Sequence, residues 1–243
     1  MKNYVITIPC RLNSKRFPQK LIKKLNNREI FLHTYDRCLK VCPKEKIFIL
    51  TDSSIIAKIC DKNNVNYIKT RKNLITGSDR ISSIKNKLLA KTYINVQGDE
   101  PIINPQDIKK IINYSLKYKN LTLNGYTQIS FDQAKRKSIP KVIFDKKKML
   151  VYMSRNLIPY NYSKKKLNTK YFKQVCIYAY PRNILKFFNN KKNDLEKNED
   201  IEILRLTENS IKIKMIKLSN KSFAIDLKSD LKKLKFHKLN SLI

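Results

Sequence analysis

Asn95-Val96-Gln97-Gly98-Asp99-Glu100-Pro101 is the segment that says most about the fold of this chain. It follows Lys91-Thr92-Tyr93-Ile94, which predicts the start of a short buried strand, so Asp99 comes just past a strand's carboxyl end. In open parallel α/β sheets, ligands bind in the crevice beyond those ends. Gly98 is one of only three glycines in the 243 residues, and glycine is favoured where a backbone turns tightly or approaches a ligand. An ordinary Gly-Asp turn explains these residues equally well.

Strand and helix patterns alternate on both sides of this segment. This repetition predicts an α/β fold with a mostly parallel, Rossmann-like sheet flanked by helices and right-handed crossovers. The predicted strands lie near residues 4–9, 46–50, 66–69 and 92–96, and the predicted helices near 30–42, 54–63, 79–90 and 105–118. Asp52 follows one strand and is interpreted as a helix cap, as is either Ser78 or Asp79 before the helix near residue 80.

The second half of the chain has a different pattern, in which some strands are expected to be antiparallel. We expect strands at 121–128, 140–145, 150–154, 172–180 and 211–218, and helices at 184–189, 201–206 and 227–239. One α/β domain can reach this length. The sequence therefore predicts a single domain over 1–243, with a smaller mixed β/α subdomain within 121–190.

The loop after the first strand is strongly basic. Tyr4 to Pro9 is a β-branched run ended by proline, and the loop that follows carries Arg11, Lys15, Arg16 and Lys20. Arginine offers a planar fork to phosphate oxygens and lysine a compact point charge, so such a loop can hold a polyphosphate. The alternative is a solvated basic loop, because Lys and Arg make up 53 of the 243 residues.

The formal net charge of +34 raises the question of a nucleic-acid partner. The lysines are spread over the whole chain without a basic tail or stripe, and few Gly and no Trp accompany them. This composition favours a genome-wide bias toward A and T codons over dedicated nucleic-acid binding. The positive electrostatic field of the protein would still steer an anionic substrate toward it.

Several other classes are excluded by the sequence. No stretch approaches the roughly 20 apolar residues of a membrane helix, and the basic loop follows the first strand too soon for a signal peptide, so we expect a cytoplasmic protein. Three separated glycines exclude a Gly-x-Gly-x-x-Gly fingerprint and a Walker loop. Five scattered cysteines and two histidines argue against a zinc site and predict buried, reduced thiols.

Taken in order along nearly the whole chain, several motifs resemble those of the 3-deoxy-manno-octulosonate cytidylyltransferase (CMP-Kdo synthetase) family. The motif from Asn95 to Pro101 is specific to that group, whereas the basic first loop is shared more widely among sugar nucleotidyltransferases. The matching segments are Ile8-Pro9-x-Arg11, Ser14-x-Arg16-x-Pro18-x-Lys20, Thr51-Asp52, Thr76-Gly77-Ser78-Asp79-Arg80, Asn95 to Pro101, Tyr152-x-Ser154-Arg155-x-x-Ile158-Pro159, Ile177-Tyr178-x-Tyr180 and Glu202-x-Leu204-Arg205.

The resemblance implies a fold of the nucleotide-diphospho-sugar transferase type and a reaction. It implies an enzyme that couples CTP to 3-deoxy-D-manno-octulosonate (Kdo), an eight-carbon sugar acid, giving CMP-Kdo and pyrophosphate for lipopolysaccharide biosynthesis. It also implies Mg²⁺ as cofactor and a homodimer formed through the 121–190 region. Magnesium binds through one or two carboxylates, substrate phosphates and water.

The resemblance assigns roles to particular residues. The implied catalytic residues are Arg11, Lys20 and Asp99, and the implied metal ligands are Asp99 and Asp226. CTP would be bound by Arg11, Ser14, Lys15, Lys20, Ser78, Arg80 and Gln97. The sugar acid would be bound by Gln97, Arg155, Gln174, Tyr178 and Glu202. Without the resemblance, Asp226 would be interpreted as a helix cap.

Two residues depart from the family pattern at the sugar. Gln174 replaces a histidine and Cys176 replaces a glycine. Glutamine can hydrogen-bond a hydroxyl or carboxylate but cannot carry a charge. The sugar could therefore be a related acid, such as 8-amino-Kdo or a sialic-acid-like sugar. From another class, the chain could be a basic nucleic-acid-binding protein on a degenerate transferase fold, although such a protein has no need to keep both Asp99 and Asp226.

Overall fold

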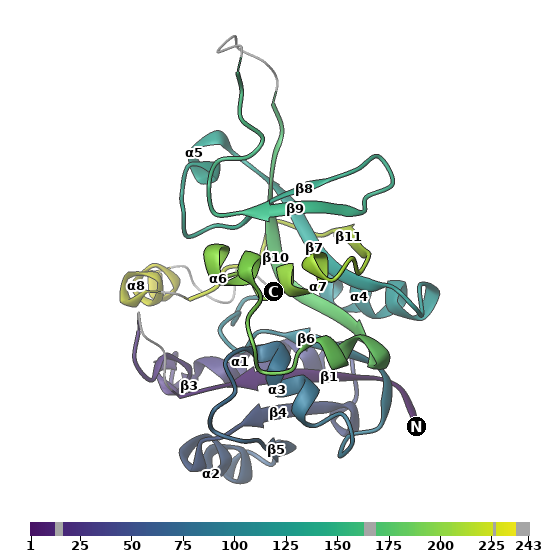
Figure 1. Cartoon of the computed structure of the whole chain (residues 1–243). Coiled ribbons are helices and arrows are strands. Elements are labelled where there is room, and N and C mark those ends of the chain that lie inside the picture. Colours follow the sequence, from purple (N-terminus) through teal and green to yellow (C-terminus); the bar gives the residue numbers. More distant parts are fainter. Residues whose placement is uncertain (13–16, 163–168, 226, 237–243) are drawn as a thin grey trace.

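The computed structural model describes residues 1–12, 17–162, 169–225 and 227–236 (Figure 1). Four strands form the parallel part of the sheet, and they confirm the expected βα alternation. They are β1 (Lys2–Cys10), β4 (Ile47–Thr51), β5 (Tyr67–Lys69) and β6 (Ala90–Val96). β1 lies between β4 and β6, and β5 pairs with β4, all in parallel.

The rest of the sheet is mixed, as the second half of the sequence predicted. β10 (Tyr171–Pro181) runs antiparallel to β6 on one side and to β7 (Thr122–Ile129) on the other. β11 (Ile213–Lys217) then pairs in parallel with β7. The order β11-β7-β10-β6-β1-β4-β5 therefore contains one reversed strand, β10.

Helices cover both faces of this sheet because its strands point apolar side chains alternately to each side. In β1, Ile6 and Ile8 pack into one core, and Val5 packs into the other. The first core lies under α1 (Ile30–Leu39), α2 (Ser54–Lys62) and α4 (Pro105–Lys117). The second lies under α3 (Gly77–Ser83), η3 (Arg182–Phe187) and α7 (Leu204–Glu208).

At one end of the molecule, β8 (Lys141–Phe144) and β9 (Leu150–Ser154) form an antiparallel pair beside β10 (Figure 1). This part falls within the predicted 121–190 subdomain. Tyr160 and Tyr162 in the loop beyond β9 are 72% and 89% exposed. The subdomain and its role in dimerisation stay predictions. The remaining elements are η1 (Lys20–Ile22), β2 (Lys24–Leu25), β3 (Arg28–Glu29), η2 (Lys44–Lys46), α5 (Phe131–Ala134), α6 (Asp194–Glu199) and α8 (Lys228–Phe236).

Some predicted boundaries were wrong. The helix expected at 79–90 is α3, which begins at Gly77 and ends at Ser83. The Ser83 hydroxyl donates to the Arg80 carbonyl oxygen over 2.8 Å, and such side-chain bonds compete with helical backbone bonds. The helix expected at 184–189 is the 3-10 helix η3. The short helices α5 and α6 were not predicted.

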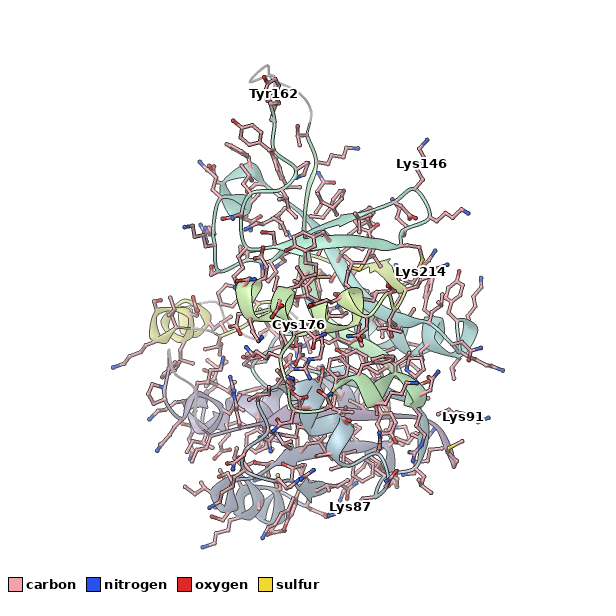
Figure 2. The ribbon with its side chains drawn as sticks, viewed as in Figure 1. Lys87, Lys91, Lys146, Tyr162, Cys176 and Lys214 are labelled. Atoms are coloured by element: carbon pink, nitrogen blue, oxygen red, sulfur yellow. The ribbon has the colours of Figure 1, made fainter. Side chains whose placement is uncertain are left out.

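The basic charge is dispersed over the fold, as the sequence suggested. In the view of Figure 2, Lys87, Lys91, Lys146 and Lys214 project from different parts of the ribbon, whereas Cys176 lies near its middle. Among the described helices, none combines the length and apolar character that crossing a bilayer requires.

Candidate active site at the carboxyl ends of the strands

Three neighbouring parallel strands end at the same edge of the sheet. Arg11 follows β1, Asp52 follows β4, and Gln97 follows β6. Because these strands are adjacent and parallel, their carboxyl ends bring the predicted site segments together, as the topology of open α/β sheets requires.

Gly98 allows the Asp99 turn to lie directly against the end of β1. A Cβ atom on Gly98 would come within 2.8 Å of the Cys10 Sγ and 3.2 Å of the Pro9 carbonyl oxygen. From the other side, the Thr34 hydroxyl donates to the Gly98 carbonyl oxygen over 3.1 Å. The glycine is therefore needed for close backbone approach, one of the two roles that the sequence suggested.

Lys20 and Asp99 meet across this edge. The Lys20 Nζ lies 2.5 Å from Oδ2 of Asp99 and 2.8 Å from the carbonyl oxygen of Ile225. The Ile225 N–H donates to the Asp99 carbonyl oxygen over 2.9 Å. The Lys20 ammonium group thus lies between the Asp99 carboxylate and the Ile225 carbonyl oxygen. The backbone bond from Ile225 also joins the segment before residue 226 to the Asp99 turn.

These oxygens fit the expected Mg²⁺ site. Carboxylate and carbonyl oxygens are the ligands that magnesium prefers, and it needs only one or two carboxylates. Within the described part of the chain, no group of three or more His, Cys, Asp or Glu side chains is placed to hold a metal. Asp226, the second predicted ligand, lies outside the described residues, as do Ser14 and Lys15 of the first loop.

Arg80 and Arg11 bring two guanidinium groups to the neighbouring strand ends. Arg80 is buried, hydrogen-bonds the Thr70 hydroxyl, and has its Nη2 3.5 Å from Oδ2 of Asp52. Burial lowers the pKa of Arg80, Asp52 opposes that shift, and nearby Arg11 adds to it. Arg11 itself is exposed and donates to the Ile75 carbonyl oxygen over 3.3 Å. Arg80 already has Asp52 as its charge partner, whereas the only described bond of the Arg11 guanidinium is to a neutral carbonyl oxygen, so Arg11 can still bind an anionic ligand.

The interpretation of Asp52 as a helix cap was wrong. Ser53 is the N-cap of α2, and its hydroxyl accepts from the Ile56 N–H. At α3 the cap is Thr76, whose side chain accepts from the Asp79 N–H, so neither Ser78 nor Asp79 fills that place. Asp52 is instead the charge partner of Arg80.

Ser78, Gln97 and Glu202 meet at the start of α3. Glu202 accepts from the Ser78 N–H over 3.1 Å and from the Gln97 Nε2 over 3.3 Å. Burial raises the pKa of Glu202, and the bond from Ser78 partly offsets this. The Ser78 hydroxyl donates to the Tyr180 hydroxyl over 3.0 Å. Residues predicted for CTP and for the sugar acid are thus in direct contact.

A buried ion network underlies this contact. Arg205 Nη1 lies 2.7 Å from Asp79 Oδ1, and Arg205 Nε lies 2.6 Å from Glu196 Oε2. The side chains of all three are at most 1% exposed. Arg205 therefore fastens α7, which follows Glu202, to the first turn of α3 and to α6. The sequence motif containing Glu202 and Arg205 pointed to this region of the chain, but the motif did not identify Glu196.

Tyr178 and Cys176 line the same region from β10. The register between β10 and β7 shifts between Val175 and Tyr178, which leaves Cys176 in a bulge. Burial raises the pKa of the Cys176 thiol, and the charges of Glu100, Asp99 and Glu202 raise it further. Tyr178 is buried and stacks on Tyr180 with ring centroids 5.6 Å apart. Cys176 had no predicted role beyond its departure from the family pattern, yet it lies among the acids of the site.

Gln174 and Arg155 are held by other parts of the protein. The Gln174 Nε2 donates to the Asn124 Oδ1 over 3.0 Å in a buried environment. The Arg155 guanidinium donates to main-chain carbonyl oxygens of Glu199 and Asp200, over 2.6 and 3.0 Å. No described contact joins either side chain to Asp99 or Glu202. Among the predicted site residues, described contacts thus join Lys20 to Asp99, and Ser78 and Gln97 to Glu202, whereas Gln174 and Arg155 contact other segments.

Comparison with known proteins agrees with this geometry. The family model described as Cytidylyltransferase matches residues 5–213. The 3-deoxy-manno-octulosonate cytidylyltransferase of a Nitratiruptor species is 33% identical over 239 residues, covering 95% of this chain and 98% of that protein. This chain belongs to the 3-deoxy-manno-octulosonate cytidylyltransferase family. The family member from Escherichia coli is 30% identical over 237 residues, covering 97% of this chain and 96% of that protein.

Solved structures extend the comparison to the fold. CMP:2-keto-3-deoxy-manno-octonic acid synthetase complexed with CTP superimposes with a TM-score of 0.91 and 29% identity, covering 99% of this chain and 100% of the other. A putative glucose-1-phosphate thymidylyltransferase from Bacillus anthracis has a TM-score of 0.68 at 11% identity, covering 96% of this chain and 94% of the other. The second match shows a shared fold only. The predicted fold class and family are confirmed.

Proposed function

We propose that this protein transfers the cytidylyl group of CTP to Kdo, giving CMP-Kdo and pyrophosphate for lipopolysaccharide biosynthesis. The observation that carries the proposal is the Lys20, Asp99 and Ile225 contact, in which a carboxylate, a cation and a carbonyl oxygen meet beyond the strand ends. Family membership and the match to a synthetase complexed with CTP support this choice of substrates.

In the proposed reaction, the 2-hydroxyl oxygen of the sugar forms a bond to the α-phosphorus as the bond to pyrophosphate breaks, and the hydroxyl proton is released to solvent. Arg11 and Lys20 neutralise the triphosphate, with Ser14 and Lys15 from the same loop. Asp99 and Asp226 would hold Mg²⁺, which would offset charge on the phosphate oxygens when bound. The side chains mainly position the reactants and stabilise charge.

The sugar acid is proposed to lie on the side of Gln97, Tyr178 and Glu202, with Arg155 and Gln174 bordering it. Glu202 is fixed by two hydrogen-bond donors, so it can accept from a sugar hydroxyl without reorienting. We further propose a cytoplasmic homodimer that associates through the 121–190 region. All five cysteines are free thiols, in keeping with a reducing compartment.

A sugar panel tests the substrate directly. The protein is incubated with CTP and Mg²⁺ and with Kdo, 8-amino-Kdo or N-acetylneuraminate, and pyrophosphate is measured. We expect kcat/KM to be higher with Kdo than with either of the other two sugar acids. A clear preference for 8-amino-Kdo or for the sialic acid would keep the reaction class but reassign the substrate. Omission of the sugar acid is the control for CTP hydrolysis.

The +34 charge supports one alternative from another class, a nucleic-acid-binding protein. If codon bias produced the charge, we expect only weak, non-specific nucleic-acid binding, with dissociation constants of about 10⁻⁴ to 10⁻⁶ M at physiological salt. The affinity should fall steeply as the salt concentration rises. A gel-shift titration from about 50 to 300 mM salt distinguishes the two. Salt-resistant binding to one sequence would favour the alternative.

A further inference from the structure

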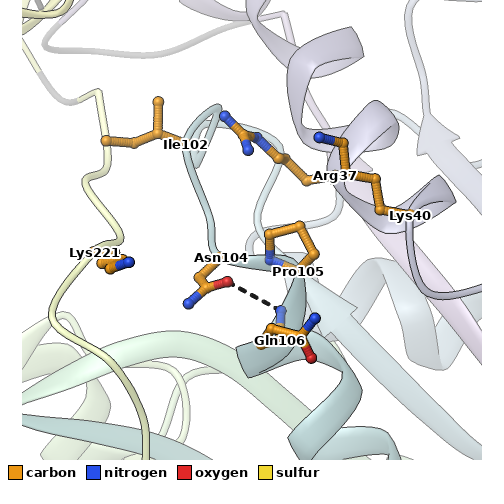
Figure 3. Close-up of a pocket in the computed structure, with 7 residues that line it drawn as sticks. All are labelled: Arg37, Lys40, Ile102, Asn104, Pro105, Gln106 and Lys221. Atoms are coloured by element: carbon orange, nitrogen blue, oxygen red, sulfur yellow. Dashed lines mark hydrogen bonds between the residues drawn. The ribbon is translucent and has the colours of Figure 1, made fainter. Parts of the chain in front are cut away.

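One cavity is lined by none of the strand-end site residues described above. It has a volume of about 250 Å³ and is lined by Arg37, Lys40, Ile102, Asn104, Pro105, Gln106 and Lys221 (Figure 3). Arg37 comes from α1 and Lys40 directly follows that helix, α4 contributes its amino-terminal end, and Lys221 comes from the segment after β11. None of these seven residues has a role in the proposed transfer.

Arg37 is the unusual residue of this cavity. It is only 8% exposed, and within the described residues its guanidinium has no hydrogen bond or ion pair. Figure 3 shows its side chain reaching from α1 toward Ile102. Its neighbour Asp36 is already paired with Arg28, through contacts of 2.6 and 2.8 Å. The Arg37 nitrogens are not among the fully buried, unpartnered polar atoms of the described residues, so they open on the cavity, where a cation without an acid partner favours an anion.

The other charges around the cavity reinforce this preference. Lys40 and Lys221 are exposed at its rim, and in the described chain neither is joined to an acid. The Asp107 carboxylate, in the first turn of α4, is occupied by the Ser219 N–H and hydroxyl, at 3.0 and 2.5 Å. It keeps its negative charge, because both donors are neutral, but it is not one of the residues that line the cavity, which carry three cations and no acid.

The amino-terminal end of α4 contributes the positive end of its helix dipole, but few backbone N–H groups there are free to donate. The Gln106 N–H donates to the Asn104 Oδ1 over 3.1 Å, as Figure 3 shows, and the Asp107 N–H donates to the Asn104 carbonyl oxygen over 3.0 Å. Pro105 has no N–H. The positive end of the helix dipole still faces the cavity, while the hydrogen bonds to an anion must come from Arg37, the two lysines and the Gln106 amide.

We propose that this cavity is a binding site for a small phosphate anion, either inorganic phosphate or pyrophosphate. Three cations and a helix amino-terminus suit a multiply charged anion better than a single carboxylate, and the arginine fork matches phosphate oxygens. The volume of about 250 Å³ lies below the roughly 300–1,000 Å³ of sites for drug-sized ligands, which favours a small anion over a whole nucleotide.

The site is connected to the Asp99 turn through two segments. Ile102 follows Asp99 in the same loop, and the Asn104 Nδ2 donates to the Ser219 hydroxyl over 3.2 Å. The chain from Ser219 passes Lys221 and reaches Ile225, whose N–H donates to the Asp99 carbonyl oxygen over 2.9 Å. An anion that joins Lys221 to Arg37 therefore restrains the segment that leads to residue 226.

Isothermal titration calorimetry with inorganic phosphate, and separately with pyrophosphate, tests this site at constant ionic strength. Four variants accompany the wild type. Arg37→Lys keeps the charge but removes the fork, and Lys221→Ala removes a rim cation. Lys20→Ala disables the proposed triphosphate site. Lys147→Ala is the matched control, because Lys147 is exposed in the turn between β8 and β9. Circular dichroism verifies that each variant is folded.

We expect saturable binding of one anion that Arg37→Lys and Lys221→Ala each weaken about tenfold, the factor that 1.4 kcal/mol represents. Lys20→Ala and Lys147→Ala should retain this binding event. The relative affinities of phosphate and pyrophosphate identify which anion the site prefers. No saturable binding, or equal affinity in folded Arg37→Lys and Lys221→Ala, would overturn the proposal. Neither result depends on nucleotidyl transfer, so the proposed enzyme function is tested separately.

Discussion

The nucleotide end and the sugar end of the candidate active site are held in different ways. We define the nucleotide end as Arg11, Lys20, Arg80 and Asp99, and the sugar end as Arg155, Gln174, Tyr178 and Glu202. At the nucleotide end, charged groups face each other across strand ends, and Arg11 is open to solvent. At the sugar end, Arg155, Gln174 and Glu202 are already hydrogen-bonded to neighbouring groups.

This difference indicates where single substitutions will have large effects. A charge removed at the nucleotide end has no equivalent group to replace it, and the proposed binding of metal and phosphate depends on that charge. At the sugar end, Gln174 and Tyr178 are neutral, and the charged side chains of Arg155 and Glu202 are already hydrogen-bonded to protein partners, so a single substitution there is expected to change less. The buried network around Arg205 connects the two ends through α3 and α7.

The largest expected effect concerns that connection. Arg205→Leu would leave Asp79 and Glu196 buried without their cation, which typically costs about 3–5 kcal/mol. We expect a loss of this size in the free energy of unfolding, measured by urea denaturation. Arg71→Leu, at an exposed arginine, is the control and should change stability by about 0.5 kcal/mol or less. Similar stabilities for the two variants would show that the network does not hold the ends together.

The next effect concerns Asp99. Asp99→Asn keeps the side-chain shape but removes a metal-binding charge, so we expect kcat to fall at least about a hundredfold, or roughly 2.7 kcal/mol. The melting temperature should change little, because the side chain is 23% exposed and Lys20 keeps its bond to Ile225. Asp132→Asn, at an exposed residue of α5, is the control. Near-normal turnover at saturating Mg²⁺ would show that the metal assignment is wrong.

The sequence predicted most of what shapes the nucleotide end. The β-branched run before Arg11 and the glycine before Asp99 both mark strand ends, and local pattern is enough to identify them. The charged partners could not be predicted in the same way. Glu196 lies in a Lys- and Asn-rich stretch that is typical of a solvated loop, yet it is buried against Arg205. Such burial depends on distant segments meeting.

The sugar end was predicted less completely for the same reason. Sequence order identified Arg155 and Gln174 as polar residues in matching segments, but their partners are far along the chain. Gln174 bonds Asn124 across β10 and β7, and Arg155 bonds the backbone at the end of α6, a helix that the sequence did not reveal. Arg37 likewise resembled any cation on an amphipathic helix until its burial was known.

A third prediction separates the first loop from the general basic charge. Arg11→Ala and Lys20→Ala should each raise the KM for CTP about tenfold or more, because a hydrogen bond to a charged group contributes roughly 1.5–3 kcal/mol. Lys147→Ala should leave it unchanged. Steady-state kinetics at fixed salt provide the measurement. If the three variants behave alike, the loop is part of the dispersed basic background.

The smallest effect is expected at the sugar end. Gln174→His restores the residue type that this chain lacks relative to the family pattern, and the KM for the sugar acid should change by the worth of one neutral hydrogen bond, about 0.5–1.5 kcal/mol. Because histidine titrates near pH 6.5, that KM should also become pH-dependent between about pH 5.5 and 7.5. The KM for CTP should stay constant. A change in CTP binding instead would contradict the division into two ends.

Phosphorus-31 NMR of one reaction tests the proposed cytidylyl transfer. The wild-type protein is mixed with CTP, Mg²⁺ and Kdo, and the phosphorus signals are followed with time. We expect the triphosphate signals to disappear while a phosphodiester signal of CMP-Kdo and the signal of pyrophosphate grow in equal molar amounts. Unchanged CTP with Kdo and with each related sugar acid, from folded protein, would contradict cytidylyl transfer by this protein.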